Sequence, residues 1–195
     1  MLEYGYHDVP AGHTVSVVTH LEMLSKAEAR PEAEIQLTLE RVKRPMVGWY
    51  RNLFRAVGAD YLWFGRLTQS EEELAETLNN PSVHVYVLKA GTEEAGLLEL
   101  DFREAGACEL AYFGLTPEHV GGGAGRWLMN RAIALAWEQP IKRLHVHTCT
   151  LDSPKALDFY IRSGFTAFKR QIEIEQDPRL IGLLPKSAAP QIPMI

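Results

Sequence analysis

The chain has 195 residues, of which 46% are hydrophobic and 23% charged, and this composition is typical of a globular domain. It excludes a disordered, collagen-like or coiled-coil protein. Acidic residues number 25 and Lys plus Arg 20, so the net charge of −5 makes nucleic acid an unexpected partner. No apolar run reaches the ~18–20 residues of a membrane span, so no membrane partner is expected either.

Two cysteines, Cys108 and Cys149, are too few for a disulfide framework and lack the spacing of metal ligands. This usage indicates a reducing compartment, and we expect a cytoplasmic protein. We expect a single domain over residues 1–195, with an N-terminal arm over 1–12 and an irregular, Pro-rich C-terminal tail over 180–195.

The first part of the chain predicts two strands and then two helices. β-Branched and apolar runs favour strands, whereas apolar residues at helical spacing, ended by Gly or Pro, favour helices. Ser70 and Glu73 form a capping box, which marks the start of the second helix. The expected strands span 14–24 and 35–39, and the expected helices span 47–58 and the segment from Ser70 to Pro81.

The rest of the chain predicts an antiparallel meander followed by a strand–loop–helix–strand–helix–strand unit. Ser153 is the expected N-cap of the last helix, with Pro154 as its first residue and Gly164 as its end. The predicted class is therefore α/β (α+β), a mixed, largely antiparallel sheet of about six to seven strands flanked by helices. The other segments are strands over 83–91, 95–104, 107–115, 143–150 and 165–176 and a helix over 124–139.

A glycine cluster, Gly121 to Gly123 followed by Gly125, stands between a predicted strand and a long helix. The first N–H groups of a helix lack intrahelical partners and lie at its positive end, so the amides over 121–126 form an expected anion socket. The alternative is a flexible turn that only starts the helix. A P-loop is excluded because no Lys follows Gly125, and a dinucleotide fingerprint because Arg126 stands where Gly is needed.

Two stretches resemble motifs of the GNAT N-acetyltransferase superfamily. LTPEHVGGGAGRWLM is similar to its acyl-CoA loop, Gln/Arg-x-x-Gly-x-Gly/Ala, with Val120 in the Gln/Arg position. DSPKALDFYIRSGF is similar to its closing motif, Asn-x-x-Ala-x-x-x-Tyr-x-x-x-Gly-Phe, with Ser153 in the place of Asn and Asp152 as an alternative. The resemblance covers residues 70–174. Its matching positions are Gly123, Gly125, Ala156, Tyr160, Gly164 and Phe165.

The resemblance implies a GNAT-like fold and acetyl-CoA as co-substrate. Backbone amides of the glycine loop would hold the diphosphate, and the backbone over 113–115 would pair with the pantetheine arm like an added strand. The implied coenzyme-binding residues are Phe113, Gly114, Leu115, Val120, Gly121, Gly122, Gly123, Ala124, Gly125, Arg126, Asp152 and Ser153.

Acetyl transfer from a thioester to an amine needs a base for the amine and an acid for the leaving thiolate. The resemblance assigns the acid to Tyr160, whose phenol is protonated at pH 7; helical periodicity alone favours a packed aromatic. Glu109, six residues before Leu115, has the spacing of the base in histone-acetylating members, and an exposed strand carboxylate is the alternative. Strand alternation predicts that Glu109, Ala111 and Phe113 share one face. Glu99 and Asp101 are rival bases.

The aromatic residues between positions 49 and 64 include Tyr50 and Trp63. In the superfamily that the chain resembles, the helices after the first strand line the acceptor pocket, so the resemblance implies that these two residues wall it and favour an amine through cation–π contact. His145 and His147 share a strand face but lack a third ligand, so no metal is predicted.

The predicted function is acetyl transfer from acetyl-CoA to a primary amine of a small molecule or amino acid, by direct attack in a ternary complex. The alternatives are a protein lysine or N-terminal acetyltransferase and a non-catalytic acyl-CoA sensor. A homodimer formed through the last strand and the tail is a further partner that the sequence allows.

Overall fold

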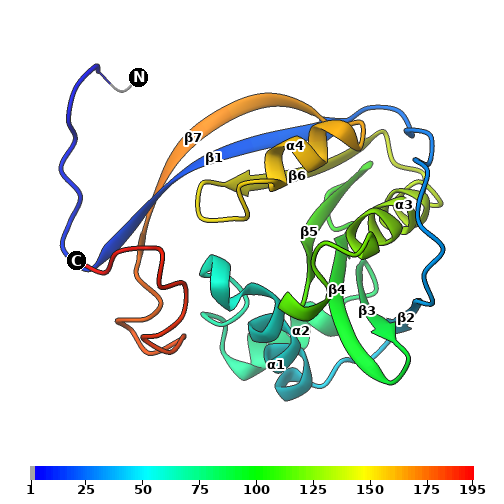
Figure 1. Cartoon of the computed structure of the whole chain (residues 1–195), viewed down its shortest axis with the longest axis horizontal. Coiled ribbons are helices and arrows are strands. Elements are labelled where there is room, and N and C mark those ends of the chain that lie inside the picture. The colour runs from blue at the N-terminus through cyan, green and yellow to red at the C-terminus, as the bar shows by residue number, and fades with distance from the viewer. Residues whose placement is uncertain (1–2) are drawn as a thin grey trace.

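The computed structural model describes residues 3–195, so Met1 and Leu2 of the predicted arm lie outside the described residues. One mixed, mostly antiparallel sheet of seven strands forms the centre of the described chain, with four α-helices around it, and the predicted fold class is confirmed (Figure 1). The strand order is β2-β3-β4-β5-β6-β1-β7. The strands are β1 (His13–Met23), β2 (Thr38–Val42), β3 (Val83–Ala90), β4 (Glu93–Asp101), β5 (Ala107–Leu115), β6 (Arg143–Cys149) and β7 (Thr166–Gln176); the helices are α1 (Val47–Gly58), α2 (Glu71–Asn79), α3 (Ala124–Ala136) and α4 (Ala156–Arg162).

The predicted meander is confirmed, since β3, β4 and β5 pair antiparallel in sequence order. The predicted strand over 35–39 is wrong at its start, because regular pairing begins only at Thr38. The chain before β2 crosses α3. There the Arg30 backbone donates to and accepts from the Asn130 side chain, and the Glu32 carboxylate accepts from Asn130 and pairs with Arg131. These contacts hold that segment on the helix and away from the sheet.

Strands β5 and β6 are parallel and pair only at their first residues, from Ala107–Arg143 to Glu109–His145. Beyond that point no pairing between them is recorded, so the sheet opens at the carboxyl ends of both strands. Strand β1 pairs with β6 on one side and with β7 on the other, both antiparallel. The β1–β7 pair forms a long curved ribbon at this side of the sheet (Figure 1).

The two faces of the sheet are covered by different helices. Leu128 of α3 and Tyr160 of α4 belong to one buried cluster, on the face that carries Leu98 and Leu110. Phe54 of α1 and Leu74 of α2 belong to the other, with Leu97 and the tail residue Leu184. Burial of each such side chain contributes roughly 1.5–3 kcal/mol, so the central strands are held from both sides.

Helix boundaries follow local sequence signals with two corrections. The capping box of α2 is present, with Ser70 Oγ accepting from the Glu73 amide and Glu73 accepting from the Ser70 amide. The predicted N-cap role of Ser153 is wrong, because Ser153 and Pro154 form a turn and α4 begins at Ala156. Helix α3 ends at Ala136 instead of Gln139, since the chain tightens into short turns ahead of Pro140.

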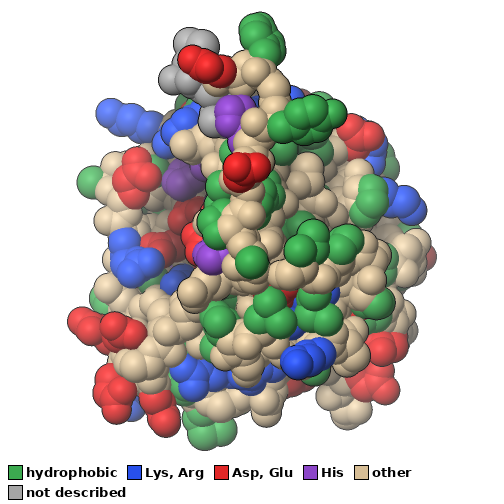
Figure 2. All heavy atoms as spheres, turned by 90° about the vertical axis from the view of Figure 1, so that its left-hand side faces the viewer, with side chains coloured by type: hydrophobic (Ala, Val, Ile, Leu, Met, Phe, Trp, Pro, Cys, Tyr) green, Lys and Arg blue, Asp and Glu red, His purple; other side chains and the backbone are tan. Residues whose placement is uncertain are grey.

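The C-terminal tail contains no helix or strand after Gln176 and folds back on the α1 side of the molecule. Arg179 is buried, pairs with Asp177, and donates to the carbonyl oxygens of Ala188, Ala189 and Ile192. Hydrophobic side chains gather on the surface at this end of the molecule (Figure 2). None of the helices within residues 3–195 combines the length and apolar character needed to cross a bilayer.

Candidate active site

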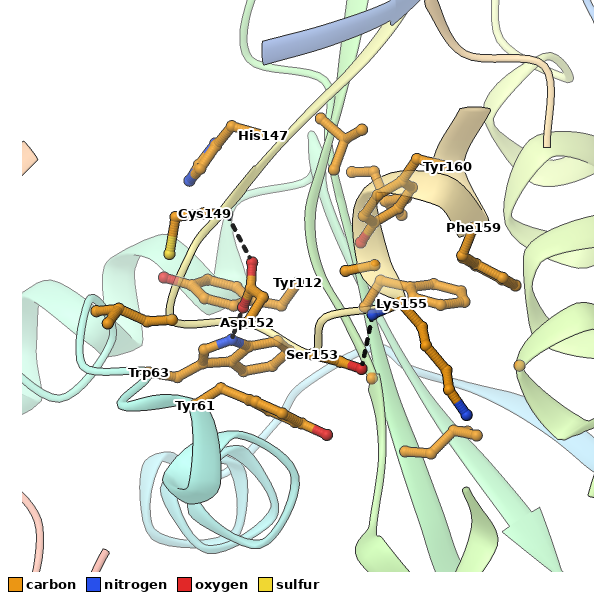
Figure 3. A pocket seen from close by; sticks show the side chains of 18 of the residues that line it. Tyr61, Trp63, Tyr112, His147, Cys149, Asp152, Ser153, Lys155, Phe159 and Tyr160 are labelled. Atoms are coloured by element: carbon orange, nitrogen blue, oxygen red, sulfur yellow. Dashed lines mark hydrogen bonds between the residues drawn. The ribbon is translucent and has the colours of Figure 1, made fainter. Parts of the chain in front are cut away.

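A cavity of about 650 Å³ opens where β5 and β6 separate, and its walls come from both faces of the sheet (Figure 3). This volume lies in the usual range for small-molecule sites. Of the residues predicted for coenzyme, catalysis or acceptor, those that line the cavity are Trp63, Phe113, Gly114, Leu115, Val120, Gly121, Gly123, Gly125, Arg126, Asp152, Ser153 and Tyr160. Those that do not are Tyr50, Glu109, Gly122 and Ala124.

At one end of the cavity lies the glycine turn that begins α3. Gly123 is the N-cap of α3 and has a φ of 91°, which L side chains rarely adopt. The first α3 amides lie beside the cavity-lining Gly121, Gly123 and Gly125, and no side chain caps them. Ala124, by contrast, is buried in the core. This end of the cavity offers backbone donors and the positive end of a helix, as an anion site requires.

Three basic side chains, Arg126, Lys155 and Arg162, line the cavity and add positive charge to it. The pKa of Arg126 is lowered, first by burial and then by repulsion from Arg30 and Arg162. Like charges held together in this way favour an anionic ligand, which would relieve their repulsion. Sequence analysis missed Lys155 and Arg162, although both lie inside the closing motif.

Strand β5 carries a β-bulge at Ala111, because Glu99 pairs with Tyr112 while the next residue, Leu100, pairs with Leu110. The prediction that Glu109, Ala111 and Phe113 share one face is therefore wrong. The extra residue puts Glu109 and Tyr112 on the α1 face and turns Phe113 to the face of α3 and α4. Bulges of this kind redirect side chains beside functional sites.

Tyr160 is only 8% exposed and packs edge-on against the rings of Phe113, Phe159 and Phe165. Its hydroxyl points into the cavity (Figure 3), and no hydrogen bond to it is recorded within residues 3–195. Burial, followed by the charge of Asp152, raises its pKa above the ordinary value. The phenol is therefore protonated at neutral pH and free to donate to a ligand.

The carboxylates proposed as bases differ in what they contact. Glu109 lies 3.4 Å from Nδ1 of the cavity residue His147, measured from its Oε1. Glu99 is fully buried and binds Tyr50 and Arg66, whereas Asp101 forms a forked ion pair with Arg103. Neither rival lines the cavity, so of the three only Glu109 reaches it, through His147.

The prediction that Tyr50 walls the acceptor pocket is wrong. Its side chain is fully buried beneath α1, stacks on Phe54 and donates its hydroxyl to Glu99. Trp63 does line the cavity, together with Tyr61 and Tyr112, and Gly114 leaves room for its ring. Tyr50 instead supports this wall from behind, because Phe54 packs against both Trp63 and Tyr112.

The Asp152 carboxylate accepts hydrogen bonds from three other residues of the protein. It accepts hydrogen bonds from Thr148 Oγ1 at 2.7 Å and, as Figure 3 shows, from the Cys149 amide at 3.0 Å and Trp63 Nε1 at 3.2 Å. It therefore fixes the loop after β6 and the orientation of the indole. Ser153 lies next to it and accepts from the Lys155 amide at 3.4 Å.

Sequence analysis also missed the acidic end of the cavity. Glu173 and Glu175 of β7 and Cys149 of β6 line it, beside His147. The alternating pattern of residues 165–176 predicts a strand but does not say which strand pairs with it. The position of the two glutamates follows only from the pairing of Glu173 with Ser16 and of Glu175 with Thr14 on β1.

Comparison with known proteins agrees with this geometry. The chain is 28% identical over 130 residues to the mycothiol acetyltransferase of Jonesia denitrificans; the match covers 63% of this chain and 40% of that protein. Its fold is similar to that of an aminoglycoside acetyltransferase from an uncultured soil sample, with TM-score 0.57, 20% identity, and coverage of 70% of this chain and 93% of that one. An acetyltransferase from Thermus thermophilus gives TM-score 0.55, 21% identity, and coverage of 72% and 97%.

The chain thus spans less than half the length of the curated relative that it matches. A GCN5-related N-acetyltransferase from Kribbella flavida is also longer: with TM-score 0.57 and 16% identity, the match covers 88% of this chain but 63% of that one. The family model for the acetyltransferase (GNAT) family matches residues 48–165, which include the glycine turn, the bulged strand and Tyr160. The chain belongs to the GNAT acetyltransferase family.

Proposed function

We propose that the protein transfers an acetyl group from acetyl-CoA to a primary amine of a small molecule. The observation that carries the proposal is the continuity of one cavity. It joins the glycine turn, the free hydroxyl of Tyr160 and a wall of aromatic and acidic side chains, on the two sides of an opened sheet.

The residues at the basic end suit coenzyme A. The α3 amides, with Arg126, Lys155 and Arg162, would hold its phosphate groups, and a Cβ built at Gly121 or Gly122 would meet no atom within 4 Å. The β5 backbone over 113–115 borders the cavity where β6 no longer pairs with it, so it has room for the peptide-like pantetheine arm. Bound there, the coenzyme supplies an activated thioester.

Direct attack by the amine fits the titratable groups better than an acyl-enzyme route. Cys149 lines the cavity, but burial and the charge of Asp152 raise its pKa, so it is held as the weakly nucleophilic thiol. Tyr160 is protonated and would donate to the departing thiolate. Glu109 contacts the cavity residue His147, so we assign to it, through His147, a part in removing the proton of the acceptor amine.

The acceptor end favours a cationic small molecule. Tyr61, Trp63 and Tyr112 offer aromatic surface, and Glu173 and Glu175 offer negative charge, a combination that attracts an ammonium group. The names of two similar proteins, an aminoglycoside acetyltransferase and a mycothiol acetyltransferase, support a small acceptor over a protein one.

The proposal is tested by thiol release from acetyl-CoA with a panel of amines, amino acids and peptides. Tyr160→Phe should lower kcat by ~10²-fold, the low end for loss of a general acid, while calorimetry shows unchanged acetyl-CoA affinity. Tyr86→Phe is the matched control, because it removes a phenol from the same buried cluster away from the cavity. Absence of thiol release with every amine would refute the function, and equal turnover in Tyr160→Phe would refute the assignment of the acid.

A further inference from the structure

His147 stands at the acceptor end of the cavity, on β6 just beyond its last recorded pair with β5. It lies on the α1 face of the sheet, as do Glu109 and Tyr112, and its side chain is 53% exposed. Sequence analysis considered this residue only as half of a metal pair. The sheet shows a different partner, since Nδ1 of His147 lies 3.4 Å from Oε1 of Glu109 on the neighbouring strand.

This contact determines which nitrogen of the imidazole is free. A carboxylate beside Nδ1 favours the tautomer with the proton on Nδ1, and the lone pair of the neutral ring is then on Nε2. No hydrogen bond or ion pair of Nε2 is found within residues 3–195, and about half of the His147 side chain is exposed. His147 therefore has an accessible basic nitrogen beside the space proposed for the amine.

We infer that His147 is the catalytic base of the acetyl transfer, and that Glu109, the expected base, is a positioning residue that orients the imidazole and holds its proton on Nδ1. The inference rests on the proposed function. Nε2 takes one proton from the acceptor ammonium; the freed amine forms the C–N bond, and the C–S bond breaks. The thiolate takes the Tyr160 proton, the second amine proton returns to Tyr160 through solvent, and the proton on His147 leaves to solvent.

The charged groups around the imidazole indicate how its activity depends on pH. Glu109 on β5 raises the pKa of His147, with smaller contributions in the same direction from Glu173 on β7 and Asp152 after β6, while burial opposes them. On β1, the His20 ring lies 5.9 Å from the His147 ring, and its own pKa is lowered by burial, by His147 and by Lys169. Acetyl transfer should therefore increase as pH rises through the raised pKa of His147.

The test compares three variants at a fixed acceptor. His147→Gln removes the base, and we expect kcat to fall by at least ~10²-fold while calorimetry shows unchanged affinity for acetyl-CoA. His145→Gln is the matched control: it lies two residues earlier on the same strand, contacts Glu104 and does not line the cavity, so its kinetics should match the wild type. Glu109→Gln keeps the imidazole but should shift the rise of kcat/KM to lower pH.

A second readout does not depend on turnover. Titration of the histidine ring resonances by NMR, assigned by the loss of one set in His147→Gln, should show a lower pKa for His147 in Glu109→Gln than in the wild type. An unchanged pKa in that variant would overturn the inference.

Equal kcat/KM in His147→Gln and the wild type at every pH would overturn the inference and leave the proposed function intact. No transfer by the wild type to any amine would overturn both.

Discussion

The buried ion pair between Arg66 and Glu99 supports the aromatic wall of the cavity, and its loss should lower the free energy of unfolding by several kcal/mol. Glu99 is fully buried, Arg66 is nearly so, and the guanidinium lies 5.3 Å from the centre of the Tyr112 ring. Arg66→Met leaves the carboxylate buried with Tyr50 as its remaining donor. Removing one partner of a buried pair typically costs ~3–5 kcal/mol. At ~2–4 °C per kcal/mol for a chain of this size, Tm should fall by roughly 6–20 °C.

The assay is urea unfolding followed by tryptophan fluorescence, with a second change to isolate the pair. Glu99→Gln added to Arg66→Met removes the stranded charge, so the double variant should regain a large part of the lost free energy of unfolding. Lys89→Met, which breaks the exposed pair with Glu40, should change that free energy by no more than ~1 kcal/mol. A loss below ~1 kcal/mol in Arg66→Met would refute the reasoning.

Two glycine substitutions test the walls of the cavity. Gly123→Val should weaken acetyl-CoA binding measured by calorimetry. A side chain at a φ of 91° is strained by roughly 1–3 kcal/mol, and it would stand beside the α3 amides. Unaltered affinity would argue against the anion site. Gly114→Ala should lower the free energy of unfolding by ~1–3 kcal/mol, since its Cβ would overlap Val57 and press on Trp63. Gly48→Ala is the control and should not destabilise the protein, because a Cβ there would meet no atom within 4 Å. Equal stabilities of the two variants would contradict the close packing at Gly114.

Local signals were sufficient for features that are formed by the backbone and by neighbouring residues in the sequence. The capping box of α2, the turns of the meander and the glycine turn before α3 each depend on residues within a few positions of one another. Such features are encoded by propensity and turn chemistry, so a single sequence predicts them. The implied coenzyme end belongs to this group, since its amides come from one loop and one helix start.

Predictions failed where the position of a side chain depended on a distant part of the chain. Tyr50 has the spacing of a helix face, but the partner of its hydroxyl is the carboxylate of Glu99 on β4, 49 residues away. The alternation of β5 was misread because the bulge at Ala111 depends on its register with β4. Neither the partner nor the register can be read from periodicity, which reports only which residues share a face of a regular element.

The acidic end of the cavity is composed almost entirely of side chains from distant parts of the chain. Its side chains come from the segment after α1, from β5, β6 and β7, and β7 reaches this position only because β1 lies between it and β6. The two ends meet on β5, where the bulge at Ala111 presents Phe113 to the face of α3 and α4 and Tyr112 to the opposite face. One inserted residue therefore lets a single strand border both halves of the cavity. For this reason the bulge, which no motif contains, links the predictable glycine-turn end of the cavity to its unpredictable acidic end.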